Sequence, residues 1–389
     1  MDTTKNILIY GGIFWPKNPY FEYNLYHHLV KNKENWDVKL LFNYSDIRLT
    51  NTQKKKKTLI KFNHEYYQNC KIKILYRFED LEFITKKFDI FICTNICVDR
   101  RKITFEKLAD YIKCKILVID LFGYDIVKKN IFSKADYIFV KGKIFKEWLI
   151  KDKFNKNNIF VTGSIYFDYY RKNNFLNFNL SKIGFEKKYK LESDKKIICI
   201  TSTNLCSTRI GMNEENLNEI IKFIRIFKHK YNFILLSYPQ DYLFYEIDKT
   251  LRRSADKKNK PDYSYIKNLV PNIKLIECQD NINACKYCDK IFHLSVGAFS
   301  SELLYYFDKV SFTMNFKNKD YYKKKIGYSK HVELPDDICN IHLDRIEDLD
   351  KDYNIDIEKL KNKISHFFKK DSRYHRNFII TLEELLKRV

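Results

Sequence analysis

Hydroxyl-bearing and glycine residues gather in two segments that each follow a short apolar run. The first comprises Thr201, Ser202, Thr203 and Arg209, and the second comprises Ser295, Gly297, Ser300, Ser301 and Glu302. Hydroxyls, a guanidinium fork and the free N–H groups of a helix start are all suited to hold an anion such as a diphosphate. The pattern predicts an anion-binding site, although Ser/Thr-rich turns and ordinary helix caps have the same composition.

Two side chains beside the second segment have more specific chemistry. Glu302 falls in the first turn of the expected helix, where its carboxylate suits a pair of sugar hydroxyls. His293 ends the preceding apolar run and is placed to contact a base or a phosphate. A buried histidine satisfied within the protein is an equally good interpretation of His293.

A glycine pair provides a third candidate. Gly11 and Gly12 directly follow the first apolar run, and a helix is expected from about Tyr20. Glycines at this position permit positive φ and a close approach of a ligand to the helix start. The segment does not match G-x-G-x-x-G, and a tight turn without a ligand is the alternative.

The elements that must position these residues are strands and helices in alternation. Short apolar runs such as 7–10, 89–93 and 116–120 lack polar alternation, as do strands buried on both faces of a parallel sheet. Residues 213–224 show an Asn cap, two early glutamates and apolar residues at helical spacing. The fold class is therefore α/β, with two Rossmann-like domains.

The expected organisation follows from a break between two arrays of strands. We predict an N-terminal domain over residues 1–175 and a C-terminal domain over 190–345, with C-terminal helices over 346–389 that return to the first domain. The polar stretch 171–196 is interpreted as the linker, because it is rich in Lys and Asn and has no clear period.

Composition limits the classes of function. The chain has 389 residues and a net charge of +23, from 72 Lys and Arg against 49 Asp and Glu. Its 31 Phe and 29 Tyr exclude a disordered chain, and nine Gly with six Pro exclude collagen-like classes. No apolar run approaches the ~20 residues of a transmembrane helix, and no targeting segment is visible. The ten cysteines have irregular spacing, so a cytoplasmic location is expected.

The order of these features resembles the GT-B glycosyltransferases and their relatives, the UDP-GlcNAc 2-epimerases and the CDP-glycerol glycerophosphotransferases. Residues 135–142 and 158–164 look like the end of the N-terminal domain in that group, and residues 289–310 look like its donor-binding loop and helix. The resemblance covers most of residues 5–330, and it implies that the N-terminal domain binds the acceptor and that the C-terminal domain binds the nucleotide sugar. It implies a GT-B enzyme of bacterial surface polysaccharide synthesis, of the kind that builds capsule or lipooligosaccharide.

The resemblance also implies a reaction. Retaining members often carry two glutamates with seven residues between them at the donor loop, but Leu294 and Val310 stand eight positions either side of Glu302. We therefore expect an inverting, metal-independent transfer from a nucleotide sugar, without a cofactor. The general base would come from the first domain, where Asp120, Asp125 and Glu22 are the candidates.

Three other activities stay open at this point. A nucleotide-sugar 2-epimerase and a glycerophosphotransferase belong to the same group, and a non-catalytic binding protein could use the same fold. Where members with CMP-sugar or CDP-glycerol donors tend to have His-Pro, this chain has Tyr238-Pro239. That difference argues against such a donor.

The expected partners are a nucleotide-sugar donor and a glycan or lipid-linked acceptor. Residues 316–328 interleave lysines with aromatics, which suits a peripheral contact with the anionic inner membrane as well as a solvated basic face. No nucleic-acid recognition module accompanies the basic charge, so nucleic acid is not an expected partner. Cys285 and Cys288 form one CxxC pair, and a structural zinc site normally needs two, so no metal site is expected.

Overall fold

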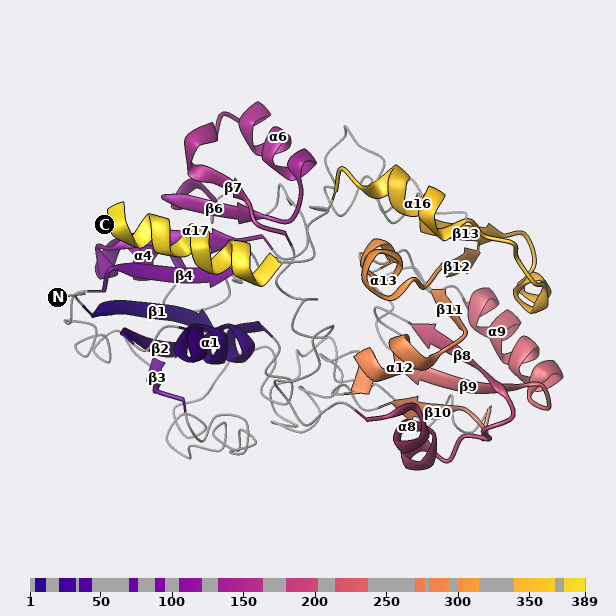
Figure 1. Ribbon diagram of the computed structural model, residues 1–389. Coiled ribbons are helices and arrows are strands. Elements are labelled where there is room, and N and C mark those ends of the chain that lie inside the picture. The colour runs from indigo at the N-terminus through magenta and orange to yellow at the C-terminus, as the bar shows by residue number, and fades with distance from the viewer. Residues whose placement is uncertain are drawn as a thin grey trace. The chain divides into compact units, whose positions relative to one another are not determined.

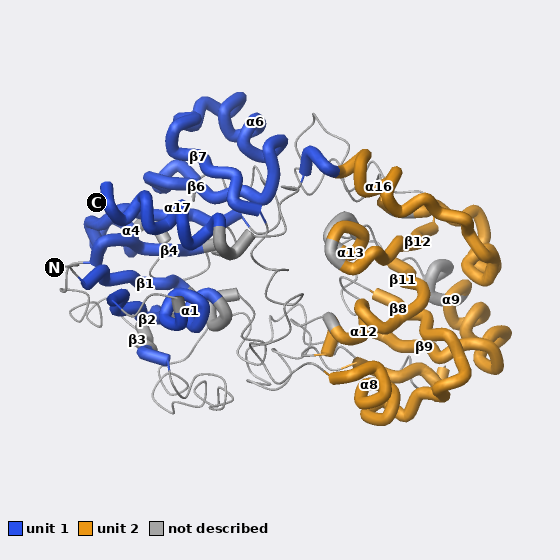
Figure 2. The backbone as a smooth tube through the Cα atoms, in the orientation of Figure 1, with its two compact units in different colours: residues 1–169, 327–329, 365–389 blue, residues 170–326, 330–364 orange. Residues whose placement is uncertain are grey.

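The computed structural model describes fourteen stretches of the chain. These are residues 4–11, 21–32, 35–43, 70–75, 88–94, 105–120, 132–163, 180–201, 214–236, 270–276, 280–293, 300–314, 339–367 and 374–388. The chain divides into two compact units (Figure 2). Unit 1 comprises residues 1–169, 327–329 and 365–389, and unit 2 comprises residues 170–326 and 330–364.

Unit 1 contains a parallel sheet of seven strands in the order β3-β2-β1-β4-β5-β6-β7. The strands are β1 (Lys5–Gly11), β2 (Trp36–Asn43), β3 (Ile72–Leu75), β4 (Ile90–Thr94), β5 (Lys115–Ile119), β6 (Tyr137–Val140) and β7 (Ile159–Val161). The strand order reverses between β1 and β4. In an open parallel sheet, ligands bind at the carboxyl ends of the strands beside such a reversal.

Four helices of unit 1 are described, together with a 3-10 turn over Lys156–Asn158. The helices are α1 (Phe21–Asn32), α4 (Phe105–Ile112), α6 (Lys143–Lys151) and α17 (Tyr374–Arg388). The last helix of the chain, α17, lies beside the strands of unit 1 (Figure 1). Phe378 of α17 is fully buried, and its ring centre lies 5.1 Å from that of Phe139 in β6.

Unit 2 contains a parallel sheet of six strands in the order β10-β9-β8-β11-β12-β13. The strands are β8 (Lys196–Thr201), β9 (Tyr231–Leu236), β10 (Lys274–Ile276), β11 (Lys290–His293), β12 (Ser311–Met314) and β13 (Asn340–Leu343). Here the order reverses between β8 and β11. The second ligand-binding position of the fold is therefore expected at the carboxyl ends of these two strands.

Helices cover both faces of the second sheet. The described elements are α8 (Lys182–Tyr189), α9 (Glu214–Phe227), α12 (Asn281–Tyr287), α13 (Ser300–Phe307), a 3-10 turn over Ile346–Asp350 and α16 (Ile357–Ile364). Side chains of α9 pack with Phe292 and Phe312 on one face. On the other face, side chains of α8, α12 and α13 pack with Cys199 and Ile291. The two-domain α/β architecture predicted from the sequence is confirmed.

The interpretation of residues 171–196 as a linker is wrong in its second half, because α8 lies within it. Phe185 and Tyr189, four residues apart, are buried against the sheet. Ser181 caps the helix by accepting a hydrogen bond of 3.0 Å from the N–H of Gly184. A helix of eight residues with three lysines and two buried positions shows no recognisable period.

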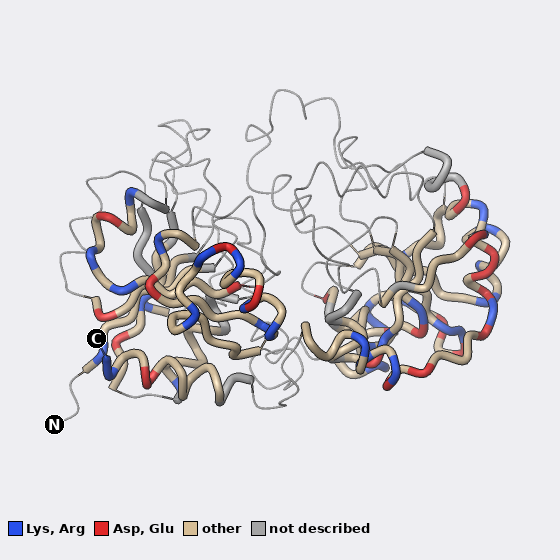
Figure 3. Tube along the Cα trace, turned by 90° about the horizontal axis from the view of Figure 1, so that it is seen from above, with Lys and Arg blue, Asp and Glu red and all other residues tan. Residues whose placement is uncertain are grey.

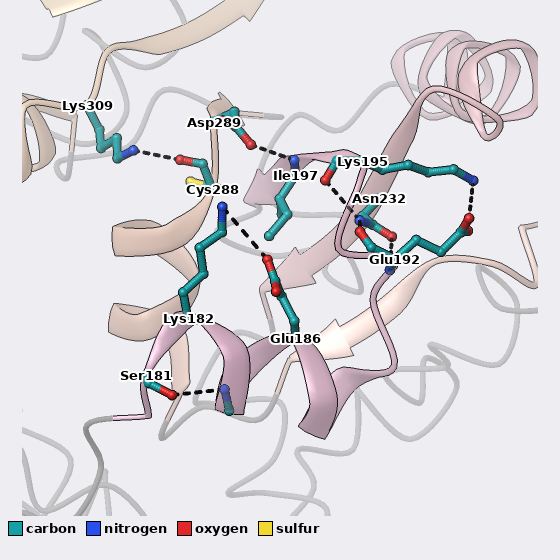
Figure 4. Close-up of polar contacts among 11 residues, drawn as sticks. Ser181, Lys182, Glu186, Glu192, Lys195, Ile197, Asn232, Cys288, Asp289 and Lys309 are labelled. Atoms are coloured by element: carbon teal, nitrogen blue, oxygen red, sulfur yellow. Dashed lines mark hydrogen bonds and ion pairs between the residues drawn. The ribbon is translucent and has the colours of Figure 1, made fainter.

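Polar contacts hold α8 and the strand after it in place (Figure 4). The side chain of Asn232 in β9 accepts from the N–H of Glu192 at 3.0 Å and donates to the Glu192 carbonyl at 2.7 Å. Asp289 accepts a hydrogen bond of 2.7 Å from the N–H of Ile197, at the start of β8. These contacts hold the amino end of β8, whereas the carboxyl end is the one at which ligand binding is expected.

Basic residues are spread over both units in the described part of the chain, interspersed with acidic residues (Figure 3). Many lysines are already paired, for example Lys71 with Asp37 at 2.7 Å and Lys115 with Asp136 at 2.8 Å.

Candidate functional site

Thr201 and His293 meet at the reversal of strand order in unit 2. Thr201 ends β8, His293 ends β11, and the two residues are directly paired in the sheet register. The hydroxyl of Thr201 and Nδ1 of His293 share a hydrogen bond. Two of the residues predicted to bind the donor, 92 positions apart in the sequence, thus form one contact at the edge where this fold binds ligands.

The imidazole of His293 is buried and neutral. The residue is 3% exposed, and burial lowers its pKa to about 4. Its Nε2 is buried and forms no hydrogen bond with any residue that the structure describes. A buried polar atom without a protein partner is costly, which makes Nε2 a candidate contact for a ligand.

The next strand holds the end of β11 from its other side. Thr313 of β12 is paired with His293 in the register, is 1% exposed, and donates from Oγ1 to the His293 carbonyl at 3.3 Å. Sequence reasoning did not identify Thr313. A hydroxyl within the apolar run 310–314 was the signal that could have revealed it.

The remaining predicted donor residues are placed only in part. Ser300, Ser301 and Glu302 begin α13, as expected, but their side chains lie outside the described part. The following residues lie wholly outside the described ranges: Ser202, Thr203, Arg209, Ser295 and Gly297. Their roles stay predictions.

Unit 1 has its own polar residues at the carboxyl edge of the sheet. Asp120 directly follows β5 and is 4% exposed, and its backbone N–H donates to the Phe139 carbonyl at 2.9 Å. Glu22 is the second residue of α1, but its side chain is not described, and Asp125 lies outside the described ranges. Of the three candidate bases, Asp120 is the one whose burial and strand-end position the structure describes.

Two further polar residues at this edge were not predicted from the sequence. Lys141 follows β6 and Thr162 follows β7, and they are 3% and 1% exposed. The ammonium of Lys141 lies 5.3 Å from the ring centre of Phe145. The signal was a polar residue directly after an apolar strand, the same signal that identified Asp120.

Gly11 ends β1, beside the reversal of strand order in unit 1, as the glycine-loop prediction requires. Gly12 lies outside the described ranges. The role of the pair in ligand binding stays a prediction.

The CxxC cysteines are core residues. Cys285 and Cys288 of unit 2 are fully buried with Cys199 among apolar side chains. Burial and the neighbouring thiols raise the pKa of Cys199 well above its ordinary value. Within the described ranges there is no group of three or more His, Cys, Asp or Glu side chains that could hold a metal ion. None of the helices in those ranges has the length and apolar character to cross a membrane.

Solved structures with the same fold are numerous, whereas no protein-family model and no curated protein sequence matches the chain. A Staphylococcus aureus MnaA–UDP co-structure has a TM-score of 0.59 at 16% identity, over 100% of this chain and 98% of that one. A Methanocaldococcus jannaschii UDP-GlcNAc 2-epimerase, solved with UDP-GlcNAc and UDP, has a TM-score of 0.54 at 13% identity, over 97% and 99%.

The wall teichoic acid polymerase TagF has a TM-score of 0.60 at 10% identity, over 98% of this chain and 89% of that one. At these identities the similarity shows the fold alone. The predicted relation to the GT-B fold of the UDP-GlcNAc 2-epimerase group is thereby confirmed.

Proposed function

We propose that the protein is an enzyme that acts on a nucleotide sugar, and specifically an inverting, metal-independent glycosyltransferase of surface polysaccharide synthesis. The observation that carries the proposal is the contact of Thr201 with the buried His293 at the reversal of strand order in unit 2. In structures of this fold, UDP or UDP-GlcNAc is bound by MnaA and by the M. jannaschii epimerase. In the proposal, unit 2 binds the donor.

Unit 1 supplies the acceptor site and the general base. The acceptor hydroxyl oxygen attacks the anomeric carbon of the sugar, the bond from that carbon to the phosphate oxygen breaks, and the nucleotide leaves. A carboxylate takes the hydroxyl proton. Asp120 is the first choice for this carboxylate because it lies buried at the carboxyl edge of the sheet. The acceptor is a glycan or a lipid-linked glycan, the latter at the anionic membrane surface.

A thermal-shift screen against UDP, GDP, CMP, CDP and ADP tests the nucleotide site. A ligand at one hundred times its Kd stabilises the folded state by about 2.7 kcal/mol, so the correct nucleotide raises the midpoint as its concentration increases. If none of the five changes the midpoint, the proposed function is wrong.

A nucleotide-sugar 2-epimerase is the second candidate, favoured by one observation. The alignment with MnaA covers 98% of that chain, whereas the alignment with TagF covers 89% of the polymerase. Incubating the protein with UDP-GlcNAc without an acceptor separates the two candidates. An epimerase produces the 2-epimer, detected by proton NMR, and a transferase does not.

A further inference from the structure

The sheet residues at the candidate site in unit 2, here called the floor of the site, are uncharged in the described part of the sheet. Thr201, His293 and Thr313 are consecutive in the register across β8, β11 and β12. Residues paired in this way point to the same face of a sheet. The row therefore presents two hydroxyls and one imidazole to the face covered by α8, α12 and α13.

The row behind it, toward the amino ends of the same strands, is also uncharged. It comprises Cys199, Ile291 and Ser311, each 0% exposed. Among the described residues His293 thus has no charged neighbour in either row that would favour its protonated form. Its neutral state follows from this setting as well as from burial.

The two nitrogens of His293 have different surroundings. Nδ1 bonds the Thr201 hydroxyl, which sets the orientation of the ring, and the carbonyl of the same residue is held by Thr313. Nε2 is buried and forms no hydrogen bond with a described residue. The ring is thus oriented by β8 while β12 holds the backbone of the same residue, and an imidazole held in this way is preorganised to form one directional hydrogen bond through Nε2.

We propose that Nε2 of His293 hydrogen-bonds an uncharged polar group of the ligand, either the nucleobase or a sugar hydroxyl, and that Thr201 is the residue that positions the ring. The inference rests on the proposed function, because it takes the ligand to be a nucleotide sugar. The phosphates are then left to other groups, since neither row of the floor offers a cation among the described residues.

Two substitutions at His293 separate contact with the ligand from a structural role. Asparagine places a polar atom near Nδ1 and keeps the bond to Thr201, whereas glutamine places one near Nε2. We expect His293→Asn to weaken binding of the nucleotide selected by the screen about tenfold, as the loss of one buried hydrogen bond does. His293→Gln should stay within about threefold of the wild type.

Inorganic pyrophosphate is the probe for the phosphates, with its affinity measured by displacement of the nucleotide. We expect His293→Asn to change this affinity less than about twofold. An equal loss of affinity for pyrophosphate and nucleotide would mean that the ring contacts phosphate. No loss of affinity for either ligand would mean that His293 has only a structural role. Both results overturn the inference. A loss present with the bare nucleotide identifies the nucleoside as the partner, and a loss confined to the nucleotide sugar identifies the sugar.

Ser311→Ala is the matched control. Ser311 is buried on the same face, and its hydroxyl likewise forms no hydrogen bond with a described residue, but it lies in the row behind. We expect unchanged nucleotide affinity. Far-UV circular dichroism of each variant identifies any that fails to fold. If the wild-type protein binds no nucleotide, the proposed function is refuted. If the wild type binds a nucleotide and His293→Asn binds it with equal affinity, this inference alone is refuted.

Discussion

The burial of Phe378 predicts that the last helix of the chain stabilises unit 1. Phe378 of α17 is 0% exposed, and its ring packs edge-on against Phe139 of β6 with 5.1 Å between ring centres. Truncating a buried phenylalanine to alanine costs about 3–5 kcal/mol, which includes the lost aromatic pair and the cavity that remains. Phe378→Ala should therefore destabilise the first unit, although residue 378 is more than 200 positions from the strands it covers.

Tryptophan fluorescence reports on that unit alone. The three tryptophans of the chain, Trp15, Trp36 and Trp148, all belong to unit 1. With a urea m value of about 2 kcal/mol per M, a loss of about 4 kcal/mol lowers the fluorescence midpoint by about 2 M. Far-UV circular dichroism, recorded on the same samples, follows both units.

Phe223→Ala is the control in unit 2. Phe223 of α9 is 2% exposed and packs against Phe233, with ring centres 5.8 Å apart. Its truncation should lower the urea midpoint of the unit 2 transition seen by circular dichroism, while the fluorescence midpoint of unit 1 stays unchanged. If Phe378→Ala moves the fluorescence midpoint no more than Phe223→Ala does, the assignment of α17 to unit 1 is refuted.

Three further predictions concern unit 2. Asp280→Asn should cost about 1.5–3 kcal/mol by chemical denaturation, because a neutral amide replaces the buried carboxylate that pairs with Lys188 at 2.6 Å; a cost below about 0.5 kcal/mol would contradict this. The pKa of His293 is lowered to about 4 from 6.5, so stability is complete above pH 6.5 and falls by up to about 3 kcal/mol as the pH drops to 4. His293→Gln should remove that part of the pH dependence in denaturation curves, and an unchanged slope would show that other groups cause it. Ser181→Ala, which removes the cap of α8, should cost about 1 kcal/mol, and a neutral result would exclude a stabilising cap.

Much of the fold can be read from local patterns. The apolar runs 7–10, 89–93 and 116–120 predicted β1, β4 and β5 to within two residues of their observed ends, because strands buried on both faces need apolar side chains at nearly every position. The cap and spacing of residues 213–224 predicted α9, which spans Glu214–Phe227. The strand β13 was missed, since Asn340 and His342 interrupt its short apolar run.

The candidate site shows the limit of such patterns. Thr201 and His293 could be recognised as residues at strand ends, and each was predicted on that ground. Their contact could not be predicted, because β8 and β11 become neighbours only through a strand order that local periodicity does not encode. Thr313 and Lys141 carried local signals that were overlooked, and the structure adds which strands flank each of them.

The amino-acid sequence by itself determined that strands and helices alternate in two arrays and where most of the strands form, because burial is a property of neighbouring residues. Only the tertiary structure decided which strands lie side by side and that α8 belongs to a core. An apolar helix face predicts that the helix is buried, but contacts between residues far apart in the chain determine the surface against which it packs.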